Sequence, residues 1–182
     1  MHDFKAPIRD IQFTLYEVLG AEQHYQRIGA DEANRELIDA IIIEGGRFAE
    51  EVLAPLNQIG DKIGCQFDNG VVTTPPGFKE AYRQYVEGGW PSLAGEAAYG
   101  GQGLPESLAT VVNEMVSTAN WSWGMYPGLS HGAKLTLAEF GTEEQKQTYL
   151  SKLTSGEWTG TMCLTESHCG TDLGLLKNKA EL

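Results

Sequence analysis

Apolar residues recur at intervals of three and four along most of the chain, which is the spacing of one face of a helix. The strongest early stripe predicts a helix over residues 31–55, with Asp31 or Asn34 as its N-cap and Pro55 as its end. The helical pattern returns in four later segments, at residues 76–87, 108–116, 124–140 and 142–153. The pattern therefore predicts a mainly α fold in which the helices form a bundle.

Turn and capping signals separate these helices. Asn69-Gly70 predicts a turn next to a short extended piece at residues 71–72, and Pro76 is expected at the first position of the next helix. Residues 88–104 are rich in glycine and proline and predict a long ordered loop. Thr142-Glu143-Glu144-Gln145 matches a capping box, so it marks the start of the last helix.

The pattern changes after that helix. Residues 158–165, with the sequence WTGTMCLT, carry no charge and predict a buried β-strand. An isolated strand cannot satisfy its backbone groups or bury both of its faces, so we expect the chain to stop inside a β-domain. The expected organisation is an N-terminal arm (1–30), a helical domain (31–157) and the start of a truncated β-domain (158–182).

Composition and charge narrow the possible functions. The 182 residues are 41% hydrophobic and carry a formal net charge of −12, without the basic patch that nucleic acid requires. No apolar run approaches the length of a membrane span, and the N-terminus has no apolar leader segment. The three cysteines are expected to be reduced thiols. The sequence thus predicts a cytoplasmic protein that binds no nucleic acid and spans no membrane.

Two short motifs could carry chemistry, and a simpler explanation is favoured for each. Residues 128–132, GLSHG, match the G-x-S-x-G nucleophile elbow, but the residues before them make a poor strand. A helix face of small residues that allows close packing is preferred. Cys163, His168 and Cys169 could bind a metal, but structural zinc takes four ligands, usually in paired short spacings. A chance cluster is preferred, so we expect no metal site.

The stretch Thr161–Asp172, TMCLTESHCGTD, concentrates hydroxyl, acidic and glycine residues. A strand ending at Thr165-Glu166, followed by a turn and Gly170-Thr171, would bring backbone N–H groups and hydroxyls to one strand end. Such groups can bind a flavin edge and a pyrophosphate without any positive charge. A cofactor loop is thus a third interpretation of this stretch, beside the metal site and a nucleophile with its base.

Three segments together resemble the acyl-CoA dehydrogenase family. CLTESHCGTD is similar to the family's flavin loop, FGTEEQKQTYLSKLTSGEW to the helix before it, and GWPSLAGEAAYGGQGL to its loop ending in Y-G-G-x-G. Their order and spacing also match, and the resemblance covers about residues 31–172. The arm, APIRDIQFTLYEVLG, resembles the longer bacterial members, which include methylthiopropionyl-CoA dehydrogenases. The resemblance implies the N-terminal helical domain of that fold, followed by the first strand of a middle β-domain.

The resemblance also implies which residues bind FAD. Thr165 would place its backbone N–H and its hydroxyl near the N5 and O4 edge of the flavin. Leu164 and Met162 would pack on the flavin ring. Gly170 and Thr171 would lie at the pyrophosphate.

The same resemblance implies a substrate site. Thr171 is expected close to the thioester arm of the acyl-CoA, and the helix that carries Val112, Met115 and Val116 is expected to line the floor of the acyl pocket. Two residues depart from the family pattern. Ser167 replaces a proline, which makes the turn less rigid, and Thr171 replaces a serine, which keeps the hydroxyl and adds a methyl group.

The implied reaction is α,β-dehydrogenation of an acyl-CoA to the trans-2-enoyl-CoA, in which a carboxylate takes the α-proton while the β-hydride moves to the flavin. The family's base is a glutamate of its C-terminal bundle, so no catalytic residue is assigned here, Glu166 included, and the chain alone is expected to be inactive. The expected partners are an electron-transfer flavoprotein or similar acceptor and, in the full-length enzyme, further copies in a homo-oligomer. The alternative is a non-catalytic helical binding or assembly module derived from this family.

Overall fold

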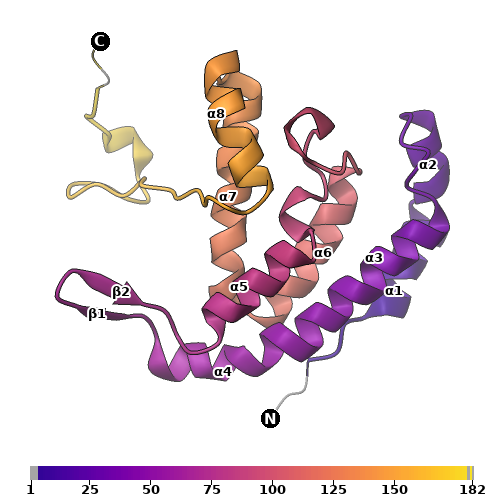
Figure 1. Ribbon diagram of the computed structural model, residues 1–182, viewed down its shortest axis with the longest axis horizontal. Helices are drawn as coiled ribbons and strands as arrows, with labels where there is room; N and C mark the ends of the chain where they lie inside the picture. Colours follow the sequence, from indigo (N-terminus) through magenta and orange to yellow (C-terminus); the bar gives the residue numbers. More distant parts are fainter. Residues whose placement is uncertain (1–3, 180, 182) are drawn as a thin grey trace.

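The computed structural model describes residues 4–179 and 181, most of which are helical. The helices in chain order are α1 (Ile8–Phe13), α2 (Ala21–Arg27), α3 (Arg35–Phe48), α4 (Ala54–Ile63), α5 (Phe78–Glu87), α6 (Glu106–Ala119), α7 (Trp121–Phe140) and α8 (Glu143–Thr154). Two π-helical turns and three 3-10 turns lie between or beyond them, at Thr14–Val18, Ala49–Leu53, Trp90–Ser92, Ala97–Tyr99 and Leu173–Leu175. Strands β1 (Gln66–Asp68) and β2 (Val71–Thr73) form an antiparallel hairpin (Figure 1). The mainly α fold predicted from the sequence is confirmed.

The core lies where α6 packs against both α3 and α7. Ile42 of α3 and Leu108 of α6 are fully buried, and burying such a side chain stabilises the fold by about 1.5–3 kcal/mol. Trp123 of α7 is also fully buried. Its ring meets Tyr85 edge-on, and its Nε1 donates a hydrogen bond to the carbonyl oxygen of Phe78 (3.1 Å). The apolar stripes read from the sequence therefore face one common core.

The first long helix begins as expected and ends later than expected. Asn34 is its N-cap, because the Asn34 side chain accepts a hydrogen bond from Leu37 N (3.0 Å). Pro55 does not end it, and that prediction was wrong: α4 continues to Ile63. The wide π-helical turn at 49–53 ends two residues before the proline. Such a turn disrupts the regular α-helical ladder just where the proline lacks an N–H donor, so the chain stays helical through it.

The hairpin follows from its turn residues. Asn69 and Gly70 have φ values of 47° and 81°, and two consecutive left-handed residues are typical of the tight turns that join antiparallel strands. The turn and the short extended piece predicted here are confirmed. All six strand residues are exposed, including the cross-strand pair Phe67 and Val72.

The start of α5 differs by two residues from the prediction. Pro76 was expected at the first helical position, but α5 begins at Phe78. Gly77 is its N-cap with a φ of 86°, a left-handed conformation that glycine adopts at little cost and that separates the proline from the helix.

Loop 88–104 is ordered, as predicted, by hydrogen bonds within itself. Gln102 N donates to Ser92 O (2.9 Å) and Gly103 N donates to Gly95 O (2.9 Å). The backbone approaches itself so closely that a Cβ on Gly101 would lie 1.9 Å from Gly95 O. Glycine at position 101 is therefore required by space.

The ends of α7 and α8 follow their capping residues. Asn120 is fully buried; its side chain accepts from Trp123 N (3.1 Å) and donates to Leu53 O (3.2 Å), which starts α7 at Trp121. The predicted stop before Gly141 is confirmed. The predicted capping box is confirmed too, because Thr142 Oγ1 accepts from Gln145 N (3.2 Å) and Gln145 Oε1 accepts from Thr142 N (2.9 Å).

The buried strand predicted over residues 158–165 is not formed. The segment has no regular structure and is mostly exposed, and the part of the chain that the structure describes offers it no neighbouring strand. A strand needs a partner for its backbone N–H and C=O groups, so its high β propensity alone cannot hold it in a sheet. The β pairing nearest to it is an isolated bridge between Glu166 and Cys169.

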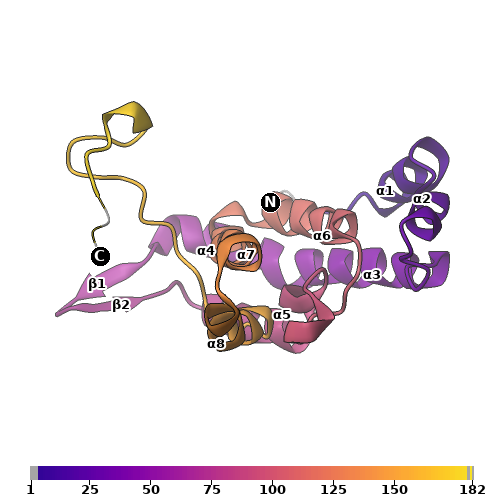
Figure 2. The same cartoon turned by 90° about the horizontal axis from the view of Figure 1, so that it is seen from above.

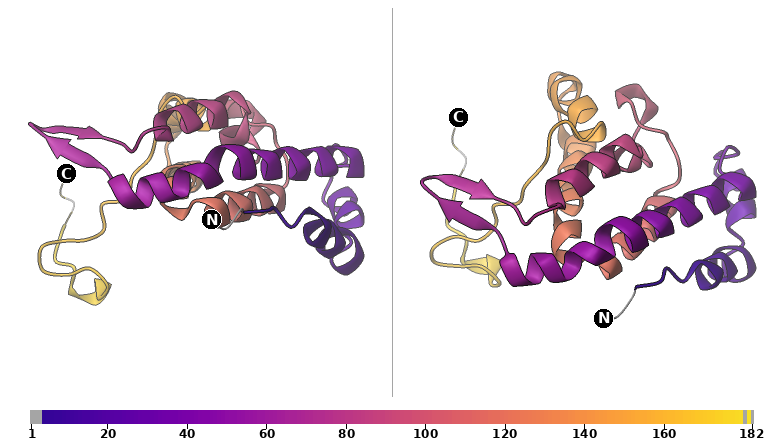
Figure 3. Two further views of the ribbon diagram at one scale, coloured as in Figure 1. Left: turned by 90° about the horizontal axis from the view of Figure 1, so that it is seen from below. Right: turned by 60° about the horizontal axis from the view of Figure 1, so that its bottom comes forward.

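The helices form an elongated body with distinct ends. The joined helix α3–α4 runs along it, with α1 and α2 packed beside the start of α3 and the hairpin extending from the end of α4 (Figure 3). Helices α7 and α8 lie side by side, and the chain after α8 extends away from them on the side where the hairpin lies (Figure 1).

Candidate functional site

The segment after α8 is tied to the helical domain as far as Gly160. Trp158 N donates to Lys152 O (3.1 Å), and Gly160 N donates to Ser130 Oγ of α7 (3.1 Å). Beyond it, all hydrogen bonds and ion pairs found for residues 161–179, within the described part of the chain, stay inside that segment. Figure 2 shows the segment leaving the helices as an extended loop. The predicted cofactor residues therefore lie on a loop outside the helical core.

A tight reversal inside this loop brings two of the predicted cofactor residues together. Glu166 and Cys169 exchange backbone hydrogen bonds, from Glu166 N to Cys169 O (2.8 Å) and from Cys169 N to Glu166 O (3.3 Å). Gly170 consequently returns beside Thr165, and a Cβ built on Gly170 would lie 3.4 Å from Thr165 Cγ2. Thr171, which follows, is exposed.

The two apolar residues predicted to pack on the flavin ring are available for such a contact. Met162 is 64% exposed and Leu164 is 38% exposed. Apolar side chains beside exposed threonine hydroxyls and backbone N–H groups suit a flat ring with a polar edge. The residues present therefore fit FAD.

The three residues predicted at the acyl pocket take different places on α6. Val112 lines a cavity, whereas Met115 and Val116 are 1% exposed and belong to the core. Met115 Cε and Val112 Cγ2 would lie 3.1 and 3.3 Å from a Cβ on Gly45 of α3, so the two helices touch closely here. Contact between these side chains and an acyl chain stays a prediction.

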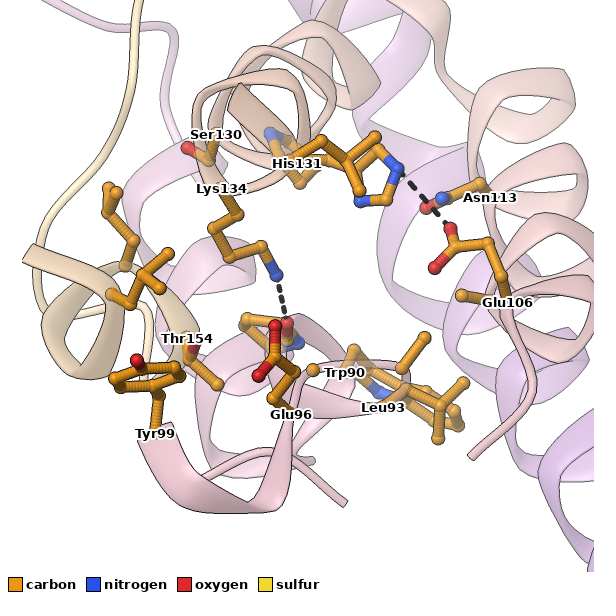
Figure 4. Close-up of a pocket in the computed structure, with 18 of the residues that line it drawn as sticks. Trp90, Leu93, Glu96, Tyr99, Glu106, Asn113, Ser130, His131, Lys134 and Thr154 are labelled. Atoms are coloured by element: carbon orange, nitrogen blue, oxygen red, sulfur yellow. Dashed lines mark hydrogen bonds and ion pairs between the residues drawn. The ribbon is translucent and has the colours of Figure 1, made fainter. Parts of the chain in front are cut away.

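The cavity beside Val112 has a volume of about 120 Å³ and lies between α6, α7, α8 and loop 88–104 (Figure 4). Two polar contacts cross it. Lys134 Nζ donates to the carbonyl oxygen of Pro91 (2.5 Å), and His131 Nε2 lies 3.2 Å from Glu106 Oε1. Carboxylate, hydroxyl and apolar side chains complete the wall, among them Glu96, Tyr99, Leu93 and Thr154.

Burial changes the acid–base behaviour of Lys134. Removal from water lowers the pKa of its ammonium group, which the charge of Glu106 partly offsets. The hydrogen bond to the Pro91 carbonyl replaces part of the contact with water that the buried ammonium group loses. Chemically, the cavity offers hydrogen-bond donors and acceptors within apolar walls, and Lys134 joins α7 to loop 88–104.

The G-x-S-x-G motif lies inside α7, so its serine does not occupy the strained strand-to-helix turn of a nucleophile elbow. The preferred explanation, close packing on small residues, holds for Ser130 and Ala133 but not for the two glycines of the motif, because a Cβ on Gly128 or Gly132 would meet nothing within 4 Å. A Cβ on Gly160 would lie 2.5 Å from Ala133 Cβ and 3.2 Å from Leu129 O, so the segment after α8 passes directly over the α7 backbone.

The cysteines and His168 do not form a recognisable metal site in the described part of the chain. No group of three or more His, Cys, Asp or Glu side chains there is arranged to hold a metal ion. Cys65, Cys163 and Cys169 are free thiols.

The sequence did not identify the residues that line the cavity, notably Lys134, His131 and Glu106. One signal was available: Lys134 follows Ser130 and precedes Ala138 at steps of four, so a lysine lies on the packed face of α7. Its partner on loop 88–104 could not be found without the fold.

Comparison with known proteins identifies the helical domain. A family model described as the N-terminal domain of acyl-CoA dehydrogenases matches residues 44–157. The chain therefore belongs to the acyl-CoA dehydrogenase family, as the sequence motifs predicted.

Particular relatives match almost the whole chain. The 3-methylmercaptopropionyl-CoA dehydrogenase of Ruegeria pomeroyi is 41% identical over 179 residues, which cover 96% of this chain and 30% of that protein. A butyryl-CoA dehydrogenase of Syntrophomonas wolfei is 33% identical and covers 94% of this chain and 29% of that protein. The chain thus spans about 30% of the length of these relatives.

A solved structure supports the same fold. The structure described as the electron transferring flavoprotein of Acidaminococcus fermentans aligns with a TM-score of 0.61 and 27% identity, covering 77% of this chain and 33% of that chain. Among the described residues, no helix combines the length and apolar character that crossing a membrane demands.

Proposed function

We propose that this chain serves as the N-terminal helical part of a flavin-dependent acyl-CoA dehydrogenase that oxidises an acyl-CoA thioester to the trans-2-enoyl-CoA. The carrying observation is the exposed loop with Thr165 and Gly170 side by side, directly after a helical domain of this family. FAD, when bound, supplies the hydride acceptor for this reaction.

The loop residues have distinct parts in this proposal. Thr165 would donate hydrogen bonds from its backbone N–H and hydroxyl to the polar edge of the flavin, and Met162 and Leu164 would cover the ring and exclude water from it. Gly170 and Thr171 would hold the pyrophosphate through backbone N–H groups and the threonine hydroxyl. Thr171 also approaches the thioester arm of the substrate. Support comes from the exposure of these side chains and from the reversal that places Gly170 beside Thr165.

The acyl chain is proposed to lie against α6. Of the three predicted residues, Val112 lines a cavity. Met115 and Val116 are buried in the core behind it and support the same helix. The names of the two relatives, which act on 3-methylmercaptopropionyl and butyryl thioesters, favour a short acyl group. Electrons would pass to an electron-transfer flavoprotein or similar acceptor, in a cytoplasmic homo-oligomer.

The test uses the product of the whole reading frame that encodes this chain. Addition of butyryl-CoA or 3-methylmercaptopropionyl-CoA under anaerobic conditions should bleach the flavin absorbance of the purified protein. Thr165→Val should slow the bleaching by about tenfold, since it removes one hydrogen bond to a polarised edge. Thr136→Val, which changes an exposed threonine of α7, is the control and should bleach at the unchanged rate. A flavin that neither thioester bleaches would overturn the proposal.

A further inference from the structure

The last anchor of the extended loop on the helical domain is a single buried serine. Ser130 is 7% exposed, and its hydroxyl is used twice: Oγ donates to Tyr126 O (3.2 Å) and accepts from Gly160 N (3.1 Å). A buried hydroxyl with both functions satisfied holds its partners in a defined geometry, because losing either partner leaves a polar group without a hydrogen bond.

Close packing also restricts which residue can occupy position 160. Gly160 passes so close to α7 that a side chain there would meet the Cβ of Ala133 at 2.5 Å and the helix backbone at 3.2 Å. Gly160 does not have a left-handed φ, so the absence of a side chain is required by space rather than by conformation. Ser130 and Gly160 therefore fit each other both by hydrogen bonding and by packing.

The Ser130–Gly160 contact lies immediately before the residues assigned to the cofactor. Gly160 lies two residues before Met162, the first of the residues assigned to the flavin. After Gly160, the hydrogen bonds found in the described residues 161–179 are all local. The direction in which the loop leaves the helices is thus set at Gly160.

We infer that Ser130, through the Gly160 backbone, is a positioning residue that fixes the starting point of the cofactor loop against α7. The inference rests on the proposed function for the identity of the ligand, but the contact itself can be tested without flavin. The contact restricts the directions from which residues 162–171 approach a cofactor. The loop therefore loses less conformational entropy when the cofactor binds.

The experiment measures amide hydrogen exchange in the 182-residue chain. Ser130→Ala removes the acceptor and should raise the exchange rate at Gly160 and in residues 158–165 by about fivefold, the effect of one buried hydrogen bond. Exchange in the middle of α6 and α8 should stay at the wild-type rate. Thr136→Ala is the matched control, because Thr136 Oγ1 also donates to the carbonyl four residues earlier (Gly132 O, 2.9 Å) but is exposed. An unchanged rate at Gly160 in Ser130→Ala, or an equal change in Thr136→Ala, overturns the inference.

A second pair of variants covers the case in which Ser130→Ala loses its helical circular dichroism. Gly160→Ala should raise exchange in residues 158–165, and adding Ala133→Gly should restore part of the protection by making room for the new methyl group. Failure of the double variant to recover any protection overturns the inference. Flavin bleaching in the full gene product is scored separately: its absence counts against the proposed function, while the exchange rates at Gly160 still decide the positioning contact.

Discussion

The N-terminal arm (described residues 4–30) and the terminal loop (residues 161–179) both lie outside residues 44–157, the part that the family model covers. The arm packs closely on the helical domain. Ile11, Leu15 and Tyr25 are buried, and the Tyr25 hydroxyl lies 2.6 Å from Ser107 Oγ at the start of α6. The terminal loop has exposed apolar side chains and only local hydrogen bonds among its described residues. A difference in composition does not explain why the arm is packed and the loop is exposed, since both segments contain apolar residues.

The two segments differ in whether the helical domain offers hydrogen-bond acceptors to them. Two acidic residues receive the arm: Asp39 Oδ1 accepts from Gln12 Nε2 (2.8 Å) and from Tyr16 OH (2.7 Å), and Glu50 binds the residues near its start. The described residues contain no comparable acceptor pair for the loop. The arm therefore contributes to the stability of the helical domain, whereas the apolar side chains of the loop remain exposed.

The largest expected difference concerns two leucines. Leu15→Ala in the arm should lower the free energy of unfolding by about 2–4 kcal/mol, because it removes a buried side chain and leaves a cavity. Leu164→Ala in the loop should change it by less than about 0.5 kcal/mol, because that side chain is exposed. Urea denaturation followed by circular dichroism measures both. Equal losses would show that the loop is also part of the stable fold.

The next comparison uses two aspartates that accept hydrogen bonds. Asp39→Ala should cost about 1–3 kcal/mol, because Gln12 and Tyr16 both lose their partly buried acceptor. Asp172→Ala in the loop removes one exposed bond to Gly174 N (3.1 Å) and should change stability by less than about 0.5 kcal/mol. Asp39→Asn keeps an acceptor and is the control; it should lie between wild type and Asp39→Ala in a thermal denaturation series.

A smaller effect should appear as a dependence on pH. The pKa of Glu50 lies below its ordinary value of 4.5, because Lys5 Nζ and then Ala6 N donate hydrogen bonds to its carboxylate. A carboxylate whose folded pKa is lowered stabilises the fold above the unfolded pKa, and this contribution is lost as the pH falls through the folded value. Glu50→Gln should therefore flatten the loss of stability below about pH 4.5.

The measurement is a set of denaturation curves between about pH 3 and 7 for wild type and Glu50→Gln. The curves should differ most near neutral pH and converge at the acidic end. The exposed carboxylate Glu181 provides a control variant, Glu181→Gln, which should follow the wild-type curve throughout. Parallel curves for Glu50→Gln and wild type would contradict a docking contact through Glu50.

The smallest effect concerns the kinetics of cleavage rather than stability. Trypsin should cut first at Lys177 in the terminal loop and only later at Arg9 in α1, because cleavage of helical, docked backbone requires local opening. Mass spectrometry of a time course identifies the order. Early cleavage at Arg9 would show that the arm is as accessible to protease as the loop, and so is not firmly docked.

Local signals in the sequence predicted most of the helical domain. The Asn34 cap, the Asn69-Gly70 turn and the Thr142 capping box each depend on residues within four positions, so short-range chemistry was enough to find them. The helix that continues through Pro55 was missed because the π-helical turn before it is invisible in a hydrophobic pattern. The strand at 158–165 was overpredicted because propensity does not supply a neighbouring strand.

The candidate site was predictable only in part. The loop motif, a continuous string of residues, indicated Thr165 and Gly170, and their proximity follows from a local reversal. The cavity depends on contacts between distant segments, such as Lys134 with Pro91, that no local pattern contains. The Ser130–Gly160 contact has the same origin: thirty residues separate the two partners, and only the packing of α7 against the chain after α8 brings them together.

The continuous helix through Pro55 has a mechanical consequence. From Arg35 to Ile63 it forms a single rod of about 29 residues, roughly 43 Å long at about 1.5 Å per residue. The arm packs along the first half of this rod, where Asp39 and Glu50 bind it, and the hairpin extends from the far end, as Figure 3 shows. The length of this continuous helix therefore sets the distance between the surface formed by the arm and the hairpin. The π-helical turn at 49–53 contains Glu50, which binds the start of the arm, so a bend on the C-terminal side of this turn would move the hairpin relative to the arm.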